Sequence, residues 1–289
     1  MNSGNQGQDK IVSIIIPAHN EETVIQRSLE QLLPGINSGE FEVIVVCNGC
    51  HDHTAELVRS LHESIHAIEV ERPSKANALN VGDSVASSFP RIYLDADVLL
   101  SADSVRAIIR DLKQGDKMVV SPVPHTDLSL SSWAVRAYYD AWMSLPYVKF
   151  GMIGAGVYAV SETGRKRFNE FPDIIADDGY IRLLFSSQER GVVTDAISTI
   201  IAPKDIRSLV KINTRIRIGG YELHERYAEL LRNDDKDYGS AVGGMLKSWR
   251  MWHKTALYIV INLWVRSRAR NHITRHGHAG WARDDSSRE

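Results

Sequence analysis

The sequence is poor in cysteine, has no long hydrophobic run and carries almost no net charge. Only 2 of its 289 residues are cysteines, and 34 lysines and arginines nearly balance 36 aspartates and glutamates. A chain with so little net charge is not expected to bind nucleic acid through a general basic surface. The longest apolar candidate, residues 256–265, falls far short of the roughly 20 residues that a membrane-spanning helix needs. Residues 1–10 are polar and lack the apolar core of a signal peptide, so we expect a cytoplasmic protein.

Both cysteines stand in one short string, Cys47-Asn48-Gly49-Cys50-His51. The string matches the C-x-x-C-H pattern of haem attachment, and C-x-x-C also occurs in redox and zinc sites. Haem attachment usually accompanies export, and four ligands crowded into residues 47–53 would hardly enclose a tetrahedral zinc ion. A thioredoxin-like pair stays open as an alternative, because such a motif lies where a strand meets a helix. We expect two small residues in a turn, without a cofactor.

The first half of the chain alternates between strand and helix patterns. Short apolar, β-branched runs predict buried strands, and the segments between them have the caps and periodicity of helices. The predicted strands are 11–16, 41–46, 67–71, 91–94 and 118–121, and the predicted helices are 21–33, 53–63, 75–87 and 103–114. This order predicts an α/β fold of Rossmann-like type, a three-layer sandwich with a mostly parallel central sheet. Asn20 is expected to cap the first helix, and Pro34-Gly35 to end it.

The second half is less regular. The expected elements are a helix at 131–145, a loop at 151–156, a strand at 157–160, a helix at 177–186, short strands at 192–193 and 198–201, a basic helix at 205–218, an acidic linker at 233–237 and a long helix at 244–270. The predicted organisation is a flexible N-terminus at 1–10, one α/β domain at 11–230, and a C-terminal helical extension at 231–289 with a polar tail.

Two carboxylates follow a predicted buried strand directly, in Tyr93-Leu94-Asp95-Ala96-Asp97. Side chains alternate along a strand, so Asp95 and Asp97 can point the same way, at the edge where α/β proteins bind ligands. Carboxylate oxygens suit Mg²⁺ or Mn²⁺, which often hold substrate phosphates too. The glycine-rich phosphate loops of dinucleotide and P-loop folds are absent after the first strand, so a metal would have to balance phosphate charge. The simpler alternative is that Asp95 caps a turn and Asp97 caps the next helix.

Four strings at the ends of successive predicted strands resemble the family 2 glycosyltransferases, which have a GT-A fold. They are Val12-Ser13-Ile14-Ile15-Ile16-Pro17-Ala18-His19-Asn20-Glu21-Glu22, Val45-Val46-Cys47-Asn48-Gly49-Cys50-His51-Asp52-His53-Thr54, Lys75-Ala76-Asn77-Ala78-Leu79-Asn80 and Tyr93-Leu94-Asp95-Ala96-Asp97. The resemblance covers residues 10–220. It implies transfer of a sugar from a nucleotide-diphosphosugar, with a UDP-sugar favoured, to an acceptor hydroxyl, with inversion and with Mn²⁺ or Mg²⁺ as cofactor.

The resemblance also implies roles for single residues. Asp97 resembles the direct metal ligand, with Asp95 beside it, and Asp178 resembles the catalytic base, as the second member of the pair Asp177-Asp178. The loop beside the donor sugar and the acceptor would be Gly154-Ala155-Gly156. The residues that resemble the nucleotide and diphosphate contacts are Pro17, Ala18, Glu21, Asn48, Asp52, Lys75, Asp95, Arg215 and Arg217.

Two departures from the family pattern bear on the reaction. The acidic pair is Asp177-Asp178 here, where the family usually has Glu-Asp. The Gln-x-x-Arg-Trp string of processive synthases is replaced by Asn213-Thr214-Arg215-Ile216-Arg217. Together with the absence of membrane spans, this favours a single transfer over polymerisation.

Several of these assignments have simpler alternatives. Asp177 and Asp178 could merely favour a helix N-terminus through its dipole. Lys75 could be a surface lysine, and Arg215 and Arg217 a solvated helix face. Two other functions also stay open, a sugar-phosphate nucleotidyltransferase, whose glycine-rich first loop is absent, and a non-catalytic nucleotide-sugar-binding or scaffold protein with the same fold.

The predicted C-terminal helix combines tryptophans with a cluster of arginines. Trp252 and Trp264 belong to an apolar stretch, which Arg266, Arg268 and Arg270 follow. Aromatic residues beside arginines predict a helix that lies on a membrane surface and does not span it. Such contact, at the inner face of the cell membrane, would bring the protein to a lipid-linked acceptor, whereas a small-molecule or saccharide acceptor would not need it. The alternative is that this helix packs on the α/β domain or forms a dimer.

Overall fold

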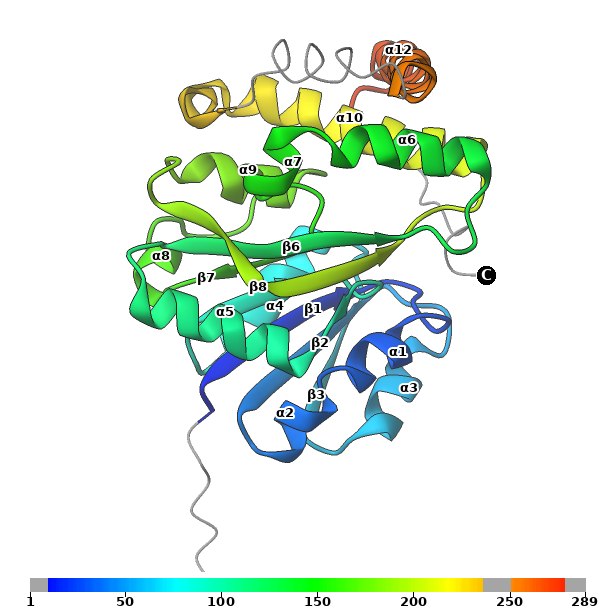
Figure 1. The fold of residues 1–289 in the computed structure, drawn as a ribbon. Coiled ribbons are helices and arrows are strands. Elements are labelled where there is room, and N and C mark those ends of the chain that lie inside the picture. Colours follow the sequence, from blue (N-terminus) through cyan, green and yellow to red (C-terminus); the bar gives the residue numbers. More distant parts are fainter. Residues whose placement is uncertain (1–9, 236–250, 279–289) are drawn as a thin grey trace, which may run out of the picture. The chain divides into compact units, whose positions relative to one another are not determined.

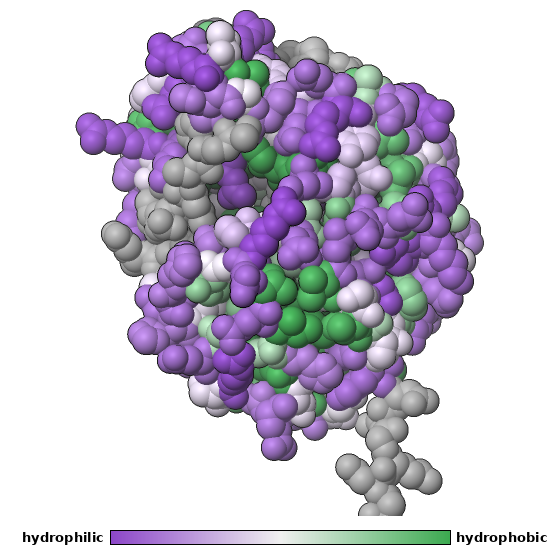
Figure 2. Space-filling model, turned by 180° about the vertical axis from the view of Figure 1, so that it is seen from behind, coloured by the Kyte–Doolittle hydropathy of each residue, from purple (hydrophilic) through white to green (hydrophobic). Residues whose placement is uncertain are grey.

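The computed structural model describes residues 10–235 and 251–278 (Figure 1). The chain divides into two compact units. Unit 1 comprises residues 1–122, 156–173 and 193–198, and unit 2 comprises residues 123–155, 174–192 and 199–289. The surface seen in Figure 2 is largely hydrophilic, with one cluster of apolar atoms near the middle of the view. Within the described residues, no helix is long and apolar enough to cross a bilayer.

Four parallel strands form the centre of unit 1. They are β1 (Val12–Ala18), β2 (Phe41–Asn48), β3 (Ile65–Val70) and β4 (Arg91–Leu94). Strand β1 lies between β2 and β4, with Ile14 opposite Val43 on one side and Ile92 on the other. Every residue of β1 and β2 is buried, as expected for parallel strands that are covered on both faces. The carboxyl ends of these strands therefore meet at one edge of the sheet.

The sheet continues beyond β4 with strands of the other direction. The described residues form one sheet of eight strands in the order β3-β2-β1-β4-β7-β6-β8-β5. Strand β7 (Val157–Val160) runs antiparallel to β4, and β6 (Val119–Asp127) runs antiparallel to β7. The last two strands are β8 (Arg190–Ile201) and β5 (Leu99–Leu100).

Helices cover both faces of the sheet of unit 1, which confirms the predicted three-layer α/β fold. Helices α1 (Ile25–Glu30), α2 (Leu33–Asn37) and α3 (Thr54–Leu61) lie on one face, and α4 (Lys75–Val85) lies on the other (Figure 1). Right-handed crossovers require this change of face, because the chain reverses direction across the sheet after β3. The remaining helices of unit 1 are α5 (Ala102–Gln114) and α8 (Glu162–Arg165).

Unit 2 consists mainly of helices. They are α6 (Trp133–Met143), α7 (Pro146–Phe150), α9 (Asp177–Leu184), α10 (Ile206–Arg226), the 3₁₀ helix η1 (Ala228–Asn233) and α12 (Trp252–His276). Helix α12 packs against α10 and α6 around a core that includes Val135, Leu209 and Ile261. Residues 244–250 of the predicted long helix lie outside the described residues, and its described part extends to His276.

The structure differs from the sequence prediction at several junctions. The predicted helix 21–33 is two short helices, since Pro34 lies in the first turn of α2 and so begins a helix where it was expected to end one. Asn20 does not cap that helix, because it has a positive φ of 53° and its side chain accepts a hydrogen bond from the backbone N–H of His51. The two short strands expected at 192–193 and 198–201 form one long strand, β8.

A buried ionic cluster fixes β4 to its surroundings. The carboxylate of Asp83, on α4, lies 2.5 Å from Arg91 and 2.7 Å from Arg165, and the hydroxyl of Tyr93 donates to it over 2.5 Å. Burial raises the pKa of Asp83, but the hydrogen bonds from Arg165, Tyr93 and Arg91 outweigh it, so the pKa lies below its ordinary value. Tyr93 also stacks on Tyr158 of β7, with 5.1 Å between ring centroids. The last residues of β4 are thus held from both sides.

The packing of α4 on β1 leads to a stability prediction. A Cβ added at Gly82 would lie only 2.6 Å from the Cγ2 of Ile15, so the helix would have to move away from the sheet. We expect Gly82→Ala to lower the free energy of unfolding by about 1–3 kcal/mol, measured by urea denaturation followed by circular dichroism. Gly220→Ala is the matched control, because Gly220 is also helical and a Cβ there meets nothing within 4 Å. The control should be stabilised by up to about 1 kcal/mol, and a similar loss in both variants would contradict the prediction.

Candidate functional site

The chain turns tightly where β4 ends, and the turn presents the two predicted carboxylates. The backbone N–H of Asp95 donates to the carbonyl of Gly156 over 2.9 Å, and the N–H of Val98 donates to the carbonyl of Asp95 over 3.1 Å. Ala96 and Val98 are buried, whereas Asp95 and Asp97 are half-buried. Asp95 and Asp97 are therefore the more exposed residues of this turn and alternate with the buried Ala96 and Val98.

Lys75 lies beside the first of these carboxylates. Its Nζ is 2.7 Å from the Oδ1 of Asp95, and both side chains are about one-third exposed (34% and 38%). Lys75 is the first residue of α4, and Ser74 caps that helix by accepting a hydrogen bond from the backbone N–H of Asn77. An ion pair that is so exposed adds little to stability. Its consequence is local, because the Lys75 ammonium balances the charge of Asp95.

Two glycines of the predicted sugar loop are required by close approaches. Gly156 has a φ of +62°, and a Cβ there would lie 2.4 Å from the side chain of Val98 and 3.7 Å from the Oδ2 of Asp95. Gly154, in unit 2, has a φ of +70°, and a Cβ there would lie 2.4 Å from the ring of Trp142. Gly156 thus lets the chain pass directly beside the Asp95 carboxylate.

The loops that follow β1 and β2 are joined by hydrogen bonds from buried polar groups. Asn48, only 4% exposed, donates from Nδ2 to the carbonyl of Ala18 over 2.7 Å, and the Nδ1 of His19 donates to the carbonyl of Asn48 over 2.5 Å. The backbone N–H of Glu21 donates to the hydroxyl of Thr54 over 2.7 Å. Ala18, Glu21 and Asn48 of the predicted nucleotide site are therefore neighbours, and Pro17 precedes Ala18 in buried β1.

Asp52 holds the second of these loops in shape. Its carboxylate accepts hydrogen bonds from the backbone N–H of Glu22 (3.1 Å) and from the N–H (3.1 Å) and hydroxyl (2.6 Å) of Thr54. Partial burial raises the pKa of Asp52, but these hydrogen bonds outweigh it and leave the pKa below its ordinary value. The carboxylate is thus ionised at neutral pH. Thr54, fully buried, was not predicted as part of the site, because its hydroxyl bonds to the backbone of Glu21, which is 33 residues away along the chain.

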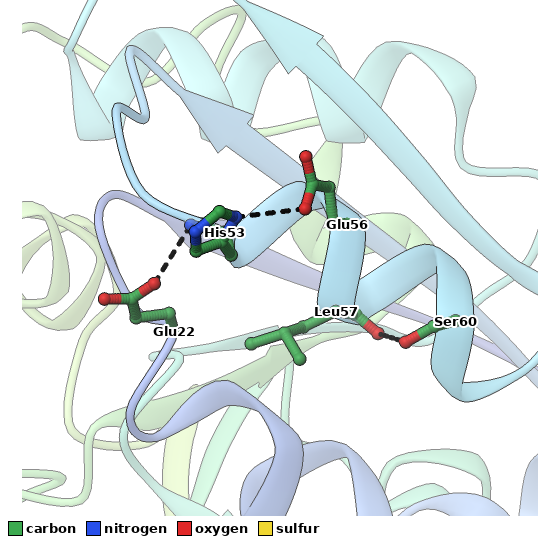
Figure 3. Close-up of a pocket in the computed structure, with 5 residues that line it drawn as sticks. All are labelled: Glu22, His53, Glu56, Leu57 and Ser60. Carbon is green, nitrogen blue, oxygen red and sulfur yellow. Dashed lines mark hydrogen bonds and ion pairs between the residues drawn. The ribbon is translucent and has the colours of Figure 1, made fainter.

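A shallow pocket of about 490 Å³ lies next to this loop, between α3 and the residues before α1. It is lined by Glu22, His53, Glu56, Leu57 and Ser60 (Figure 3). The backbone N–H of His53 donates to Glu22 over 3.0 Å, and its Nδ1 lies 3.0 Å from Glu56. The hydrogen bond to Glu56 raises the pKa of His53. None of the predicted site residues lines this pocket, and we assign it no function.

In unit 2 the acidic pair opens α9, and its two members differ in exposure. Asp177 is 3% exposed, whereas Asp178 faces solvent and accepts a hydrogen bond from the N–H of Gly179 over 2.7 Å. The chain before α9 is fixed to α10, because the N–H of Ile175 donates to Glu222 over 3.1 Å. Of the two carboxylates, that of Asp178 is therefore the one open to an incoming molecule.

Two buried arginines that were not predicted hold α9 in place. Arg182, on α9, donates to the carbonyl of Gly151 (2.8 Å), to Asp234 (3.0 Å) and to Asp235 (2.5 Å). Arg190 donates to the carbonyl of Arg182 over 2.9 Å and lies 2.7 Å from Asp235. Asp234 and Asp235 thus bind two arginines, so this part of the predicted acidic linker is anchored. The sequence does not show which acidic residues pair with a given arginine, because these partners are far apart along the chain. Only the folded structure brings them together.

Arg215 and Arg217 both lie on α10 but do not share a face. Arg215 is exposed, whereas Arg217 is half-buried and its Nη2 lies 3.4 Å from the side-chain oxygen of Asn262 on α12. Residues two apart on a helix point in different directions. Of the two, Arg215 is therefore the more accessible side chain.

The residues at the edge of unit 1 define a class of protein. A parallel sheet in the order β3-β2-β1-β4, loops joined after β1 and β2, and an Asp-x-Asp turn after β4 together form a GT-A-type nucleotide-sugar domain. The chain belongs to glycosyl transferase family 2, whose sequence profile matches residues 13–159, just over half of its length. The family and fold predicted from the sequence are thereby confirmed.

Curated relatives share the first part of this domain. The chain is 32% identical over 111 residues to a poly-beta-1,6-N-acetyl-D-glucosamine synthase of Staphylococcus epidermidis, which covers 37% of this chain and 26% of that protein. A synthase of the same description from Staphylococcus aureus (strain COL) is 31% identical over 110 residues, with the same coverage. The chain thus spans about a quarter of the length of these relatives.

Solved structures resemble more of the chain. A mannosyltransferase from Pyrobaculum calidifontis, in complex with GDP-Man and Mn²⁺, has a TM-score of 0.59 at 20% identity and covers 93% of this chain and 75% of its own. Glucosyl-3-phosphoglycerate synthase from Mycobacterium tuberculosis, in complex with Mn²⁺, UDP and phosphoglyceric acid, has a TM-score of 0.54 at 17% identity and covers 80% and 81%. At these identities the likeness establishes the fold alone.

Proposed function

We propose that the protein transfers a sugar from a UDP-sugar to an acceptor hydroxyl in a single, inverting displacement that depends on Mn²⁺ or Mg²⁺. The observation that carries the proposal is the Asp95-Ala96-Asp97 turn, whose two carboxylates are accessible at the edge where the loops after β1 and β2 also end. A complex with UDP and Mn²⁺ of a protein with the same fold supports the choice of donor and metal, and a complex with GDP-Man and Mn²⁺ supports a nucleotide-sugar and a divalent metal in general. Membership of the family supports the reaction class.

In this proposal the loops of β1 and β2 bind the nucleotide. Pro17, Ala18 and Glu21 hold the base and ribose from one side, and Asn48 and Asp52 from the other. Their mutual hydrogen bonds fix both loops before a ligand arrives, which lowers the entropy cost of binding. Lys75 lies next to Asp95, where its ammonium can also reach a diphosphate oxygen.

The carboxylates after β4 fit a divalent metal that binds together with the substrate. The described residues contain no group of three or more His, Cys, Asp and Glu side chains arranged as a metal site. Mg²⁺ and Mn²⁺ do not require one, because such ions are commonly held by one or two carboxylates, with phosphate oxygens and water as the other ligands. Asp97 would be the direct ligand and Asp95, which Lys75 partly neutralises, would support it. When bound, the metal supplies Lewis-acid stabilisation of the leaving diphosphate.

Asp178 would act as the general base. Its carboxylate is exposed in the first turn of α9. It takes the proton of the acceptor hydroxyl as the oxygen attacks the anomeric carbon, and the diphosphate leaves from the opposite face. Asp177 is buried and cannot approach an acceptor in this way, so its role would be structural.

The metal can be tested by removing the charge of Asp97. Asp97→Asn preserves the shape of the side chain but removes its charge, so UDP binding in the presence of Mn²⁺ should weaken by about 10- to 100-fold or more. Binding of UDP without metal should change little. Isothermal titration with and without Mn²⁺ measures both. Asp103→Asn is the matched control, since Asp103 is 91% exposed on α5 of the same unit and should leave binding unchanged. Full transfer activity in excess EDTA would exclude the metal.

The base can be tested by removing the charge of Asp178. Asp178→Asn should lower kcat by about 10²- to 10⁴-fold, while UDP-sugar binding persists, because the donor contacts are on other residues. Turnover and donor affinity are measured on the same preparation. If Asp177→Asn is the damaging change and Asp178→Asn is mild, the wrong member of the pair has been assigned. If nuclear magnetic resonance finds that the product keeps the anomeric configuration of the donor, the displacement is not inverting.

We further propose that α12 holds the enzyme at an anionic membrane surface, near a lipid-linked acceptor. Several large apolar side chains are exposed on this helix, namely Trp252, Ile259, Val260, Leu263 and Trp264. Helix α12 contains no aspartate or glutamate, and arginines dominate its second half. Apolar contact with the acyl boundary and attraction of the arginines to anionic headgroups act together in such helices.

Vesicle sedimentation tests this contact. The full-length protein should pellet with vesicles that contain phosphatidylglycerol and stay in solution with purely zwitterionic ones. The pair Val260→Glu and Leu263→Glu should abolish pelleting. The pair Val85→Glu and Ile197→Glu adds the same charge at exposed apolar residues of unit 1 and should have little effect. If the wild-type protein ignores anionic vesicles at low salt, α12 serves packing or self-association instead.

A further inference from the structure

The two cysteines lie at the edge that the proposed nucleotide site occupies, and none of the proposed steps uses them. Cys47 is near the end of β2 and is 1% exposed, whereas Cys50 is half-buried just after the turn. Both are free thiols, and both lie beside Ala18, which is the register partner of Cys47 on β1 and whose carbonyl is 3.6 Å from the sulfur of Cys50. The turn between them is fixed by Gly49, which has a φ of +58° and whose N–H donates to the carbonyl of Val70 over 2.7 Å.

The two thiols differ in reactivity. The hydrogen bond from Cys47 lowers the pKa of Cys50 to about 7, against the opposing effect of burial and with help from the backbone N–H of Asn20. The same hydrogen bond, together with burial, raises the pKa of Cys47 well above its usual range. Cys50 is therefore substantially a thiolate at neutral pH and is the more exposed of the two. An attacking thiolate beside a buried partner thiol is the arrangement that thiol–disulfide exchange requires.

The turn that joins the cysteines is bonded to the proposed nucleotide loop. The N–H of Asn20 donates to the sulfur of Cys50 over 3.4 Å, and the Cys50 sulfur lies 3.6 Å from the carbonyl of Ala18. Asn48, between the cysteines, donates to that same carbonyl. A disulfide would draw the Cys50 sulfur toward Cys47 and remove the acceptor of the Asn20 N–H. The oxidised turn would therefore lose a contact that helps to hold residues 18–20 in the reduced protein.

We propose that Cys47 and Cys50 form a reversible disulfide that weakens nucleotide binding by displacing residues 18–20. The Cys50 thiolate attacks a small-molecule disulfide such as oxidised glutathione, forms a mixed disulfide and releases one thiolate. Cys47 then loses its proton and attacks the Cys50 sulfur, which forms the internal disulfide and releases the second thiolate. Two protein thiols are oxidised and one small disulfide is reduced to two thiols, and a dithiol reductant reverses the exchange.

Disulfide formation is measured on the full-length protein in glutathione buffers of graded redox ratio, by alkylation and mass spectrometry. The wild type should form an internal disulfide. Cys47→Ala should accumulate the mixed disulfide at Cys50, and Cys50→Ser should form neither product at a comparable rate. Both variants keep small side chains, and circular dichroism checks that they fold. If the wild type forms no internal disulfide in oxidised glutathione alone, the proposal is overturned.

The effect on binding rests on the proposed function and is measured separately. Oxidised wild type should bind UDP in the presence of Mn²⁺ about tenfold or more weakly than the reduced protein, and the double variant Cys47→Ala/Cys50→Ser should bind equally in both buffers. Equal UDP affinity of the oxidised and reduced wild type would overturn the regulatory part. If the reduced protein binds no nucleotide, the proposed function fails. Nuclear magnetic resonance compares the backbone amide signals of Ala18 and Asn20 in the reduced and the oxidised protein. Changed signals are expected if oxidation displaces the loop, and unchanged signals would overturn the coupling.

Discussion

The parallel pairing of β1 with β2 and β4 is the constraint on which the rest of unit 1 depends. Because the three strands run the same way, their carboxyl ends meet at one edge, and the segments that follow them are neighbours. The full burial of β1 and β2 fixes this pairing, since a slip of one residue would exchange the two packed faces of each strand. This register sets the positions of the segments that follow the strands, namely the loops at 18–21 and 48–54 and the Asp-x-Asp turn.

Buried polar groups join the loops that follow β1 and β2 by hydrogen bonds. The Asn48 amide and the Thr54 hydroxyl each satisfy a backbone group of the neighbouring loop. An unsatisfied polar group in such an environment would cost about 1–3 kcal/mol, so these contacts specify one loop arrangement. At β4, the carboxylate of Asp83 forms ion pairs with Arg91 and Arg165 and accepts a hydrogen bond from Tyr93. Tyr93 lies two residues before Asp95 in the chain. The turn that carries Asp95 and Asp97 therefore follows a strand that is fixed by buried contacts.

Paired side chains that are identical in type take different roles because their surroundings differ. Asp177 is buried and Asp178 exposed, Asp95 faces Lys75, and Cys50 has a lowered pKa while its partner Cys47 has a raised one. In the pairs Asp177-Asp178 and Cys47-Cys50 one member is buried and the other is more exposed. For the cysteines, the same turn contacts the proposed nucleotide loop and sets the reactivity of the thiols, which is the basis of the proposed coupling between oxidation and nucleotide binding.

Patterns within short segments determined the fold class and most elements of unit 1. Strand 91–94 was predicted with its observed bounds. Such features depend on residue type and spacing alone. The break between α1 and α2, the unequal burial of Asp177 and Asp178 and the different faces of Arg215 and Arg217 depended on the fold, because they follow from the neighbours that pack against these residues. Only the tertiary structure decided the partners of Arg182, which lie 31 to 53 residues away along the chain. The sequence contains many acidic residues, and an arginine pairs with the ones that folding and burial place beside it.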